Sequence, residues 1–395
     1  MSGLRQIIAV ALFNLRSIPE RKGSALTAVI GIAGVVGVLV GVLAISEGFR
    51  STMTNAASPL IAVVLREGAE NEMSSGLSRD ITRIVGDAPG VARTEAGPLA
   101  SAELFVIINL PKRSVPTDAN VPLRGIQQTA YEVRGNIKMV EGRHFEPGKN
   151  EIIVGAGAAR AFAGLDLGNE VKMGQVNWKV VGIFTADGGI GESEIWADSE
   201  VLAPAYNRTE NRQSVYVRLE SPEAYQEFED ALNADPRLTV KTQLESDFYA
   251  EQSKMVTTFI MTIGFFIASL MAVGALFGAL NTMYSAVAGR TREISTLRAL
   301  GFGRGPVVAS IMVESIILSL AGGAVGAVAA YLLFDGYRAS TMNFQTFSQV
   351  SFAFSVTPRL LLNAILFATA IGLFGGIFPA IRSARLPIAS GLRES

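Results

Sequence analysis

The sequence has no cysteine and a single histidine, His144. Without cysteine there is no disulfide bond, no thiolate chemistry and no cysteine-type zinc site, and one histidine cannot build a histidine-rich metal centre. The pattern Gly-x-x-x-x-Gly-Lys-Ser/Thr, whose loop cradles nucleotide phosphates, does not occur either. We therefore predict that this chain is not an enzyme and has no catalytic residue, metal site or cofactor-binding site of its own.

Charged residues are scarce as well, at 17% of the 395 residues, compared with about 25% in ordinary soluble domains. The formal net charge of −1 gives no general attraction to nucleic acid. Apolar residues collect in four uncharged runs, each with the roughly 20 residues that a transmembrane helix needs. These runs are residues 23–46, 255–289, 315–334 and 360–381. The sequence thus predicts an α-helical integral membrane protein with four transmembrane helices.

Basic residues mark one side of the membrane. They gather before the first run, between the second and third runs, and in the C-terminal tail, whereas residues 335–359 contain only two arginines and one acid. The positive-inside rule therefore places both termini and the basic loop in the cytoplasm. Residues 47–254 and the short loop 335–359 are then expected on the opposite side.

Residues 1–22 and the run 255–289 each predict a feature besides a simple membrane span. Residues 1–22 have apolar side chains at helical spacing, which predicts an amphipathic elbow helix that lies in the membrane interface, packs on the protein's own spans, or does both. The run 255–289 would form roughly 50 Å of helix, longer than a hydrocarbon core of about 30 Å, so we expect it to include a stalk. The predicted parts are the elbow 1–22, transmembrane helices 23–46, 255–289, 305–334 and 360–381, an inserted domain 47–254, loops 290–304 and 335–359, and the tail 382–395.

The inserted domain 47–254 has the patterning of an α/β fold. We expect one of its helices to begin at Ser221-Pro222, with serine as the cap and proline in the first turn, and another, beginning near Leu244, to continue into the second span. The acids of this domain are scattered, as on a solvated surface. We predict a large α/β domain of two lobes between transmembrane helices 1 and 2. Its clearest predicted elements are strands at 61–67, 103–110 and 238–242, a hairpin at 171–187 with its turn near Gly174 and Gln175, a helix at 78–87, and a strand followed by a helix at 151–162 and at 214–232.

Each predicted span contains a Gly-x-x-x-Gly pair, and small residues at this spacing let membrane helices approach closely. We expect a tight bundle in which one pair contacts a second subunit. Two polar residues stand out. Asn281 can hydrogen-bond between helices, whereas Glu314 is either a functional intramembrane acid or an interfacial acid, and the nearby Arg298 and Arg304 favour an ion pair. The glycine pairs are Gly37/Gly41, Gly274/Gly278, Gly322/Gly326 and Gly372/Gly376.

The loop between the second and third spans reads SAVAGRTREISTLRALGFGRG over residues 285–305. It predicts a short helix with an apolar stripe of Ile294, Leu297 and Leu300, an Arg290–Glu293 pair one turn apart, and glycines at its end. The residues alone allow two interpretations. The helix either lies on the membrane surface and sets the topology, or it docks a cytoplasmic protein through an apolar anchor ringed by arginines.

This loop resembles the FtsX/MacB superfamily of ABC transporter permeases. Its RTREISTLRALG, followed by Glu314, is similar to that family's R-x-R-E-I-x-x-L-R-A-[LI]-G. Three further stretches extend the resemblance over nearly the whole chain. They are ALFNLRSIPERKGSALTAVIGIAGVVGV at the elbow and first span, EGRHFEPGKNEIIVGAGAARAF with LGNEVKMGQVNWKVVGIF in the periplasmic core, and FPAIRSARLPI near the C-terminal end.

The resemblance implies a dimeric permease, expected here as a homodimer, in the bacterial inner membrane, with porter-like and sabre-like lobes in the periplasm. It implies a separate cytoplasmic ATPase subunit that binds ATP and Mg and drives export by mechanotransmission, since the ATPase domain fused to MacB does not occur in this sequence. The loop 290–304 would be the coupling helix. Its expected ATPase contacts are Arg290, Arg292, Glu293, Leu297, Arg298, Leu300 and Gly301.

Two alternatives remain at this point. A lipoprotein-releasing permease normally works with a second, unlike permease. A transporter-like regulator of an envelope hydrolase tends to have a smaller external domain. The resemblance also leaves open the exported substrate, and whether a periplasmic adaptor protein and an outer-membrane channel take part.

Overall fold

The computed structural model describes residues 22–115, 117–385 and 387–388. The predicted elbow helix therefore lies outside the described residues, apart from Lys22. The chain divides into two compact units. A helical unit contains the described residues up to Glu47, Phe259–Tyr337, and those from Phe354 onward. An α/β unit contains Gly48–Thr258 and Arg338–Ala353.

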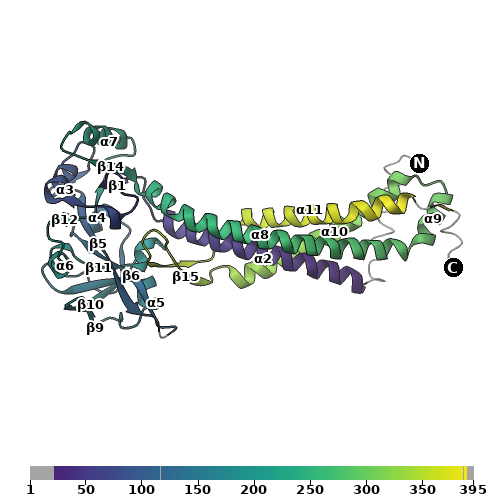
Figure 1. The fold of residues 1–395 in the computed structure, drawn as a ribbon, viewed down its shortest axis with the longest axis horizontal. Coiled ribbons are helices and arrows are strands. Elements are labelled where there is room, and N and C mark those ends of the chain that lie inside the picture. The colour runs from purple at the N-terminus through teal and green to yellow at the C-terminus, as the bar shows by residue number, and fades with distance from the viewer. Residues whose placement is uncertain (1–21, 116, 386, 389–395) are drawn as a thin grey trace. The chain divides into compact units, whose positions relative to one another are not determined.

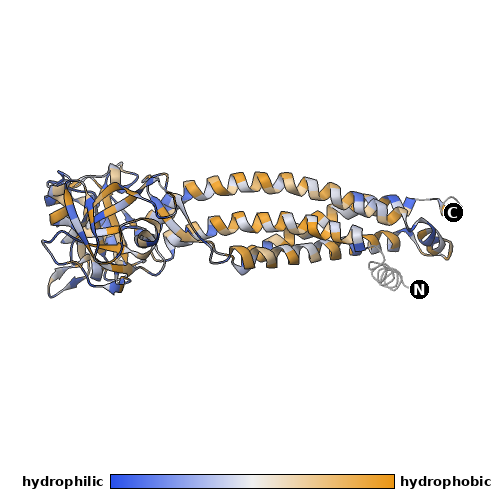
Figure 2. Cartoon of the chain, turned by 90° about the horizontal axis from the view of Figure 1, so that it is seen from below, coloured by the Kyte–Doolittle hydropathy of each residue, from blue (hydrophilic) through white to orange (hydrophobic). Residues whose placement is uncertain are grey.

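Four long helices are each long and apolar enough to cross a membrane. Figure 1 labels these helices, and Figure 2 shows that they are hydrophobic along most of their length, with hydrophilic residues nearer their ends. Each begins or ends beyond the uncharged run that predicted it, because a hydropathy pattern marks the part of a helix within the membrane and not its last hydrogen bond. The four helices are α2 (Lys22–Thr54), α8 (Glu245–Ala288), α10 (Arg304–Phe334) and α11 (Pro358–Arg385).

Glycines bring three of these helices into close contact inside the helical unit. A Cβ atom added at Gly326 of α10 would lie 2.5 Å from the carbonyl oxygen of Ala33 in α2. One added at Gly376 of α11 would lie 2.7 Å from the Cβ of Ser315 in α10. Their partners Gly322 and Gly372 are equally close to neighbouring helices. Two of the four glycine pairs are therefore used to pack the helices of one chain.

The α/β unit is built on a ten-stranded sheet. The pairs β10–β8 and β11–β6 are parallel, and the other neighbours in the sheet are antiparallel. In sheet order the strands are β14 (Val240–Leu244), β1 (Ile61–Arg66), β13 (Ser214–Arg218), β5 (Ala100–Pro111), β6 (Asp118–Ile126), β11 (Ile195–Asp198), β8 (Glu151–Gly155), β10 (Val176–Thr185) and β7 (Lys138–Gly142), with β9 (Glu170–Met173) paired to β10.

Strand β5 belongs to both halves of this sheet. Its first residues pair with β13 and its remaining residues pair with β6. One hydrophobic core lies beside β1, β13 and helices α3 and α7, and another lies beside β6, β8, β10 and helices α5 and α6. Strand β8 is buried along its whole length, which explains its uninterrupted apolar sequence. The helices are α3 (Arg79–Gly86), α4 (Ala130–Arg134), α5 (Ala156–Ala161), α6 (Ser199–Ala205) and α7 (Ala224–Ala234).

Short elements complete the α/β unit. Strand β2 pairs with β12, and β3 pairs with β4. Helix α7 starts later than predicted. Ser221 and Pro222 form a turn, in which the amide of Ala224 donates to the carbonyl of Ser221 at 3.2 Å, and the cap residue Glu223 makes no capping bond through its side chain. The short elements are β2 (Leu77–Ser78), β3 (Arg93–Thr94), β4 (Gly97–Pro98), β12 (Asn211–Arg212) and the 3₁₀ turns η2 (Glu72–Ser74) and η3 (Ile190–Ser193).

The predicted short loop 335–359 contains a β-hairpin, β15 (Arg338–Met342) with β16 (Gln349–Ala353), that belongs to the α/β unit. The amide of Ser351 donates to the hydroxyl of Ser193 at 2.9 Å, and the side-chain amide of Asn120 donates to the carbonyl of Phe347 at 2.7 Å. The sequence did not indicate these contacts, because they join residues more than 150 positions apart.

Candidate functional site

The basic loop folds into a short helix, α9 (Thr291–Ala299), between α8 and α10. Its C-terminal end is a Schellman motif. The amide of Gly301 donates to the carbonyl of Arg298, and that of Phe302 to the carbonyl of Leu297, both at 3.1 Å. Gly301 has φ +95°, a conformation that L side chains rarely adopt, so glycine is required here. The predicted stop at this glycine is confirmed.

The three residues of the apolar stripe face different surroundings. Ile294 is 8% exposed and packs in a cluster with residues of α8 and α10, Val307 and Ile311 among them. Leu297 is partly buried and lines a small cavity against the same two helices. Leu300, at the end of α9, is 73% exposed. The predicted single anchor surface is therefore wrong in part, because the first residue of the stripe packs on the protein's own helices.

Arg290 attaches α9 to the third long helix. It is 7% exposed, and its guanidinium lies 3.4 Å from the Glu314 carboxylate on α10. It also lies 4.0 Å from Glu293, the predicted neighbour one turn along. Glu314 is 5% exposed, so its expected ion pair exists, with Arg290 as the partner in place of Arg298 or Arg304. The correction reflects packing. The turn between α8 and α9 folds back over α10, which sequence proximity does not indicate.

The side chains that remain outside this packing define the accessible surface of α9. Arg292 and Glu293 are exposed, and Arg298 is partly buried. The exposed Leu300 therefore places one apolar side chain beside these charged ones. We call Arg292, Glu293, Leu297, Arg298, Leu300 and Gly301 the α9 surface.

One face of α8 carries small and polar residues that no other described residue covers. Cβ atoms added at Gly274 and Gly278 would meet no atom within 4 Å, and Asn281, one turn further along, is exposed. Gly37 of α2 is similarly open, whereas a Cβ at Gly41 would meet the ring of Phe334 at 2.9 Å. Because an amide side chain is costly to expose to lipid, this face is suited to contact another helix.

A buried charge cluster in the α/β unit was not predicted. Arg124 on β6 is 1% exposed and binds three carboxylates, those of Glu72 at 2.6 Å, Glu103 at 2.9 Å and Glu194 at 2.7 Å. Arg134, at the end of α4, binds Glu103 as well, at 2.6 Å. The reading of the domain's acids as solvated is thus wrong for these residues. No motif could have indicated the cluster, since its members come from separate elements.

Burial and ion pairing oppose each other in this cluster. Burial disfavours the charged form of Glu72, but the adjacent Arg124 guanidinium and the Ser214 hydroxyl hold its pKa below the ordinary value. Tyr216, which contacts the same carboxylate, has its phenol pKa raised well above normal by burial and by the charge of Glu72. The tyrosine therefore stays neutral and the glutamate stays ionised at neutral pH.

Comparison with known proteins places the chain in a family. A model of the MacB-like periplasmic core domain matches residues 24–235, more than half of the chain. A model of the FtsX-like permease C-terminal region matches residues 265–388. The chain belongs to the MacB/FtsX permease family. The resemblance drawn from RTREISTLRALG and the periplasmic core sequences is confirmed.

Relatives of this family member carry transporter names. It is 25% identical over 99% of its length to the macrolide export ATP-binding/permease protein MacB 1/2 of Paracoccus denitrificans, of which it covers 59%. It is 23% identical over 97% of its length to an uncharacterized ABC transporter permease of Methanocaldococcus jannaschii, of which it covers 97%. The chain spans less than two thirds of the length of the macrolide export relatives that it matches first.

Two solved structures also align with part of this chain. The crystal structure of the periplasmic region of MacB from Actinobacillus actinomycetemcomitans aligns with 49% of this chain and 92% of that chain, at 10% identity and a TM-score of 0.38. The extracellular domain of the transporter YknZ aligns with 46% of this chain and 99% of that chain, at 18% identity and a TM-score of 0.35.

Proposed function

We propose that this chain is the permease subunit of a MacB/FtsX-type ABC transporter. A separate cytoplasmic ATPase, with ATP and Mg bound, would supply the energy, and the chain would transmit it to the α/β unit so that substrate is exported by mechanotransmission. The family match supports this, as do the permease names of the relatives. The single observation that carries it is α9, which lies between two membrane helices and exposes Leu300 among charged residues.

In this proposal α9 is the coupling helix. Ile294 and Arg290 fasten it to α8 and α10, so that force applied to α9 reaches both helices. The α9 surface, with Leu300 as its apolar anchor, would bind the ATPase. A buried apolar anchor surrounded by polar contacts is the usual arrangement of an energetic hot spot. Leu300 is a sharper test residue than Leu297, because Leu297 also contacts the chain's own helices.

Leu300→Asp is expected to weaken ATPase binding by more than about tenfold, because it places a charge in a contact that must lose its water, at a cost of about 2 kcal/mol or more. The measurement is co-purification of the ATPase with the chain, and the ATP turnover that the complex supports. Since Leu300 is exposed, the variant should insert and fold normally.

Arg304→Ala serves as the control. Arg304 is the first residue of α10, outside α9, and an exposed charge contributes about 0–1 kcal/mol, so this variant should retain the ATPase. Equal retention of the ATPase by Leu300→Asp and by the unaltered chain would contradict the coupling-helix assignment.

We infer a homodimer in which α8 contacts its copy through the face that carries Gly274, Gly278 and Asn281. Small residues allow close approach, and the amide of Asn281 would find a hydrogen-bond partner across the contact. The other glycine pairs are less suited to this role. Gly322/Gly326 and Gly372/Gly376 already pack against helices of the same chain, and Gly41 faces Phe334.

Cross-linking tests the dimer face. Gly278→Cys is expected to form a disulfide-linked dimer on mild oxidation in native membranes, a simple assay because the chain has no cysteine. Phe374→Cys on α11 is the control. Phe374 is 63% exposed and lies 11 residues before the end of its helix, close to the 10 residues that separate Gly278 from the end of α8. Equal cross-linking at the two positions would rule out α8 as the dimer face.

The same proposal includes the orientation of the chain in the membrane and the division of the α/β unit into two lobes. The termini and α9 would face the cytoplasm, and the α/β unit and the 338–353 hairpin would lie in the periplasm of a bacterial inner membrane. Residues 48–258 of the α/β unit would be inserted between transmembrane helices 1 and 2, and the core beside β1 and β13 and the core beside β6, β8 and β10 would belong to porter-like and sabre-like lobes joined at β5. The charge asymmetry of the loops supports the orientation, and the separate hydrophobic cores support the lobes.

A further inference from the structure

Two chain segments meet at the start of α8. Residues 55–60, which we call the linker, connect α2 to β1. The amide of Ser58 in the linker donates to Oε2 of Glu245, the first residue of α8, at 2.9 Å. The side-chain amide of Asn136 donates to the linker carbonyl of Ala56 at 3.3 Å. The side chains of Glu245 and Asn136 therefore hold the linker at two points, one at the start of α8 and one between α4 and β7.

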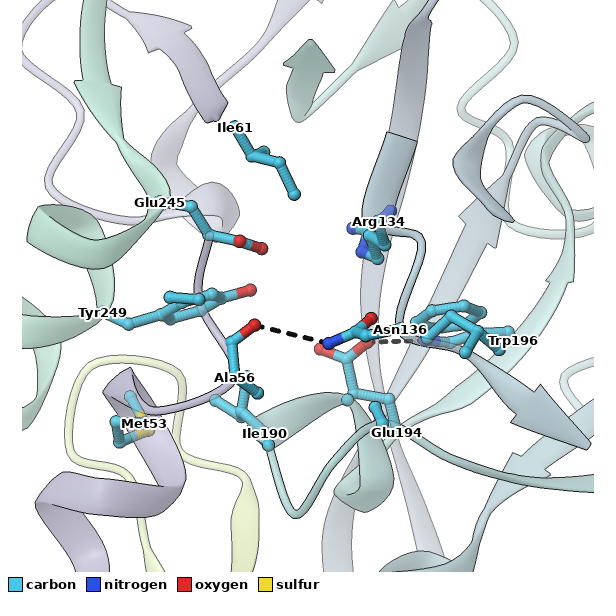
Figure 3. Close-up of a pocket in the computed structure, with 15 residues that line it drawn as sticks. Met53, Ala56, Ile61, Arg134, Asn136, Ile190, Glu194, Trp196, Glu245 and Tyr249 are labelled. Atoms are coloured by element: carbon cyan, nitrogen blue, oxygen red, sulfur yellow. Dashed lines mark hydrogen bonds between the residues drawn. The ribbon is translucent and has the colours of Figure 1, made fainter. Parts of the chain in front are cut away.

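The same two side chains line a small cavity (Figure 3). Its volume of about 30 Å³ is sufficient for one water molecule. The Oδ1 atom of Asn136 is buried in its wall and accepts no hydrogen bond from any described residue. A hydrogen-bond acceptor without a donor is unfavourable in a protein interior. A donor that reaches Asn136 Oδ1 through this cavity would therefore be stabilising.

Glu245 differs from the other acids of this region. It is 5% exposed, and no described arginine or lysine lies within 4.0 Å of its carboxylate. The buried charge cluster nearby already holds three carboxylates against two guanidinium groups. A further negative charge on Glu245 would therefore be poorly balanced. The groups that face it are Arg134 of α4, Arg124 of β6, Glu103 of β5, Glu194 before β11 and Tyr249 of α8.

Residues 245–254 include four charged side chains and precede the uncharged part of α8, so Glu245 lies outside the membrane-spanning segment. Burial raises the pKa of its carboxyl group, and so does the charge of Glu103. Arg134, the Ser58 amide and Arg124 act in the opposite direction, and the pKa is raised to about 7 from an ordinary value of 4.5. Glu245 can thus change its charge near neutral pH.

We propose that Glu245 is the proton-binding residue of a latch that holds the linker to the α/β unit while its carboxyl group is neutral. The neutral group has an O–H donor, which can reach Asn136 Oδ1 through one water in the cavity, while its other oxygen accepts from Ser58. Ionisation strengthens the Ser58 bond, but it removes the donor to Asn136 and adds charge beside a net negative cluster, and the raised pKa shows that the second effect is the larger. Further water then enters, and the linker is held less firmly. The latch involves the α/β unit alone and does not depend on an ATPase partner.

Hydrogen exchange of the linker amides in the full chain, reconstituted in lipid nanodiscs, tests the latch. After correction for the chemical exchange rate, linker protection is expected to fall by at least about tenfold between about pH 5.5 and about pH 8.5. Glu245→Gln should remain protected over the whole range, because the amide is neutral, keeps an acceptor for Ser58 and supplies a donor. Glu251→Gln is the matched control. Glu251 lies on the same helix with its side chain 60% exposed, and its replacement should leave the pH dependence of the unaltered chain.

Thermal stability supplies a second readout. Because its pKa is raised in the folded state, Glu245 contributes stability that is complete below about pH 4.5 and is lost as the pH rises through about 7. Glu245→Gln should therefore melt above the unaltered chain at alkaline pH and together with it in acid. The latch is overturned if linker protection in the unaltered chain does not change with pH, or if Glu245→Gln shows the same change.

Discussion

Replacement of Arg124 by leucine is expected to prevent the α/β unit from folding at neutral pH. Its guanidinium binds the carboxylates of Glu72, Glu103 and Glu194, and all four side chains are at least 97% buried. The substitution leaves Arg134 as the cluster's only cation against three buried carboxylates. Breaking one buried ion pair costs about 3–5 kcal/mol. Three pairs are lost together here, whereas a domain's whole stability is about 5–15 kcal/mol.

Tryptophan fluorescence is a suitable measurement, because the chain's two tryptophans, Trp178 and Trp196, are both buried in the α/β unit. The indole N–H of Trp196 donates to Glu194 at 2.7 Å, so one of them reports directly on the cluster. The purified full chain should show a cooperative thermal transition in this signal. Arg124→Leu should show none at neutral pH, and trypsin should digest its α/β unit.

Arg93→Leu is the matched control. Arg93 pairs with Asp87 at 3.0 Å, with both side chains more than half exposed, and such pairs contribute about 0–1 kcal/mol. The pH dependence distinguishes the two variants further. Glu72 has a lowered pKa in the native protein, so the stability it contributes is present above about pH 4.5 and is lost as the pH falls through its folded pKa. In Arg124→Leu the Glu72 carboxylate has lost that guanidinium and takes up a proton in acid, so the stability deficit of this variant should shrink as the pH falls. Similar neutral-pH melting of the two variants would refute the cluster's structural role.

Gly326→Leu is expected to separate α10 from α2 and to prevent assembly of the helical bundle. A Cβ at this position would lie 2.5 Å from the Ala33 carbonyl oxygen and 2.9 Å from the Ala33 Cα. These are backbone atoms of a regular helix, so no rotamer change relieves the overlap. Overpacking costs about 1–3 kcal/mol where side chains can adjust, and more where they cannot. The measurement is the fraction of detergent-extracted chain that elutes as one monodisperse species.

Gly37→Leu provides the comparison, since it makes the same substitution in a membrane helix. A Cβ at Gly37 would meet no atom of the described residues within 4 Å. This variant should therefore be recovered as well as the unaltered chain, while Gly326→Leu should be recovered mostly as aggregate. If both variants were recovered equally, the close packing of α10 on α2 would be wrong.

Local patterns in the sequence account for much of this protein. The four membrane helices follow from uncharged runs, since a run of about 20 apolar residues has few other stable environments. Strands β1, β5, β8 and β10 follow from short apolar stretches between turn residues. The stop of α9 follows from Gly301, because only glycine readily adopts its backbone conformation. The family motif lies in the same segment, so the sequence alone was enough to indicate the family.

Other features were decided by the tertiary structure alone. The sequence shows four equivalent glycine pairs, but packing buries two of them within the chain and leaves Gly274/Gly278 open. It shows three similar residues in the stripe of α9, but the fold buries Ile294 and exposes Leu300. A periodic pattern reveals that a face exists and not which neighbour covers it. That choice depends on how whole helices pack.

The buried charges show this division most clearly. The sequence predicted four helices able to cross a membrane and an α/β domain, because hydropathy and periodicity are properties of neighbouring residues. It could not indicate that Arg124 would meet Glu72, Glu103 and Glu194, or that Glu245 would lie beside them with no described cation in ion-pair contact. Those contacts depend on the order of strands in the sheet, which brings distant residues together. The solvent exposure of a carboxylate depends on the same packing, so its neighbours in the sequence do not indicate it.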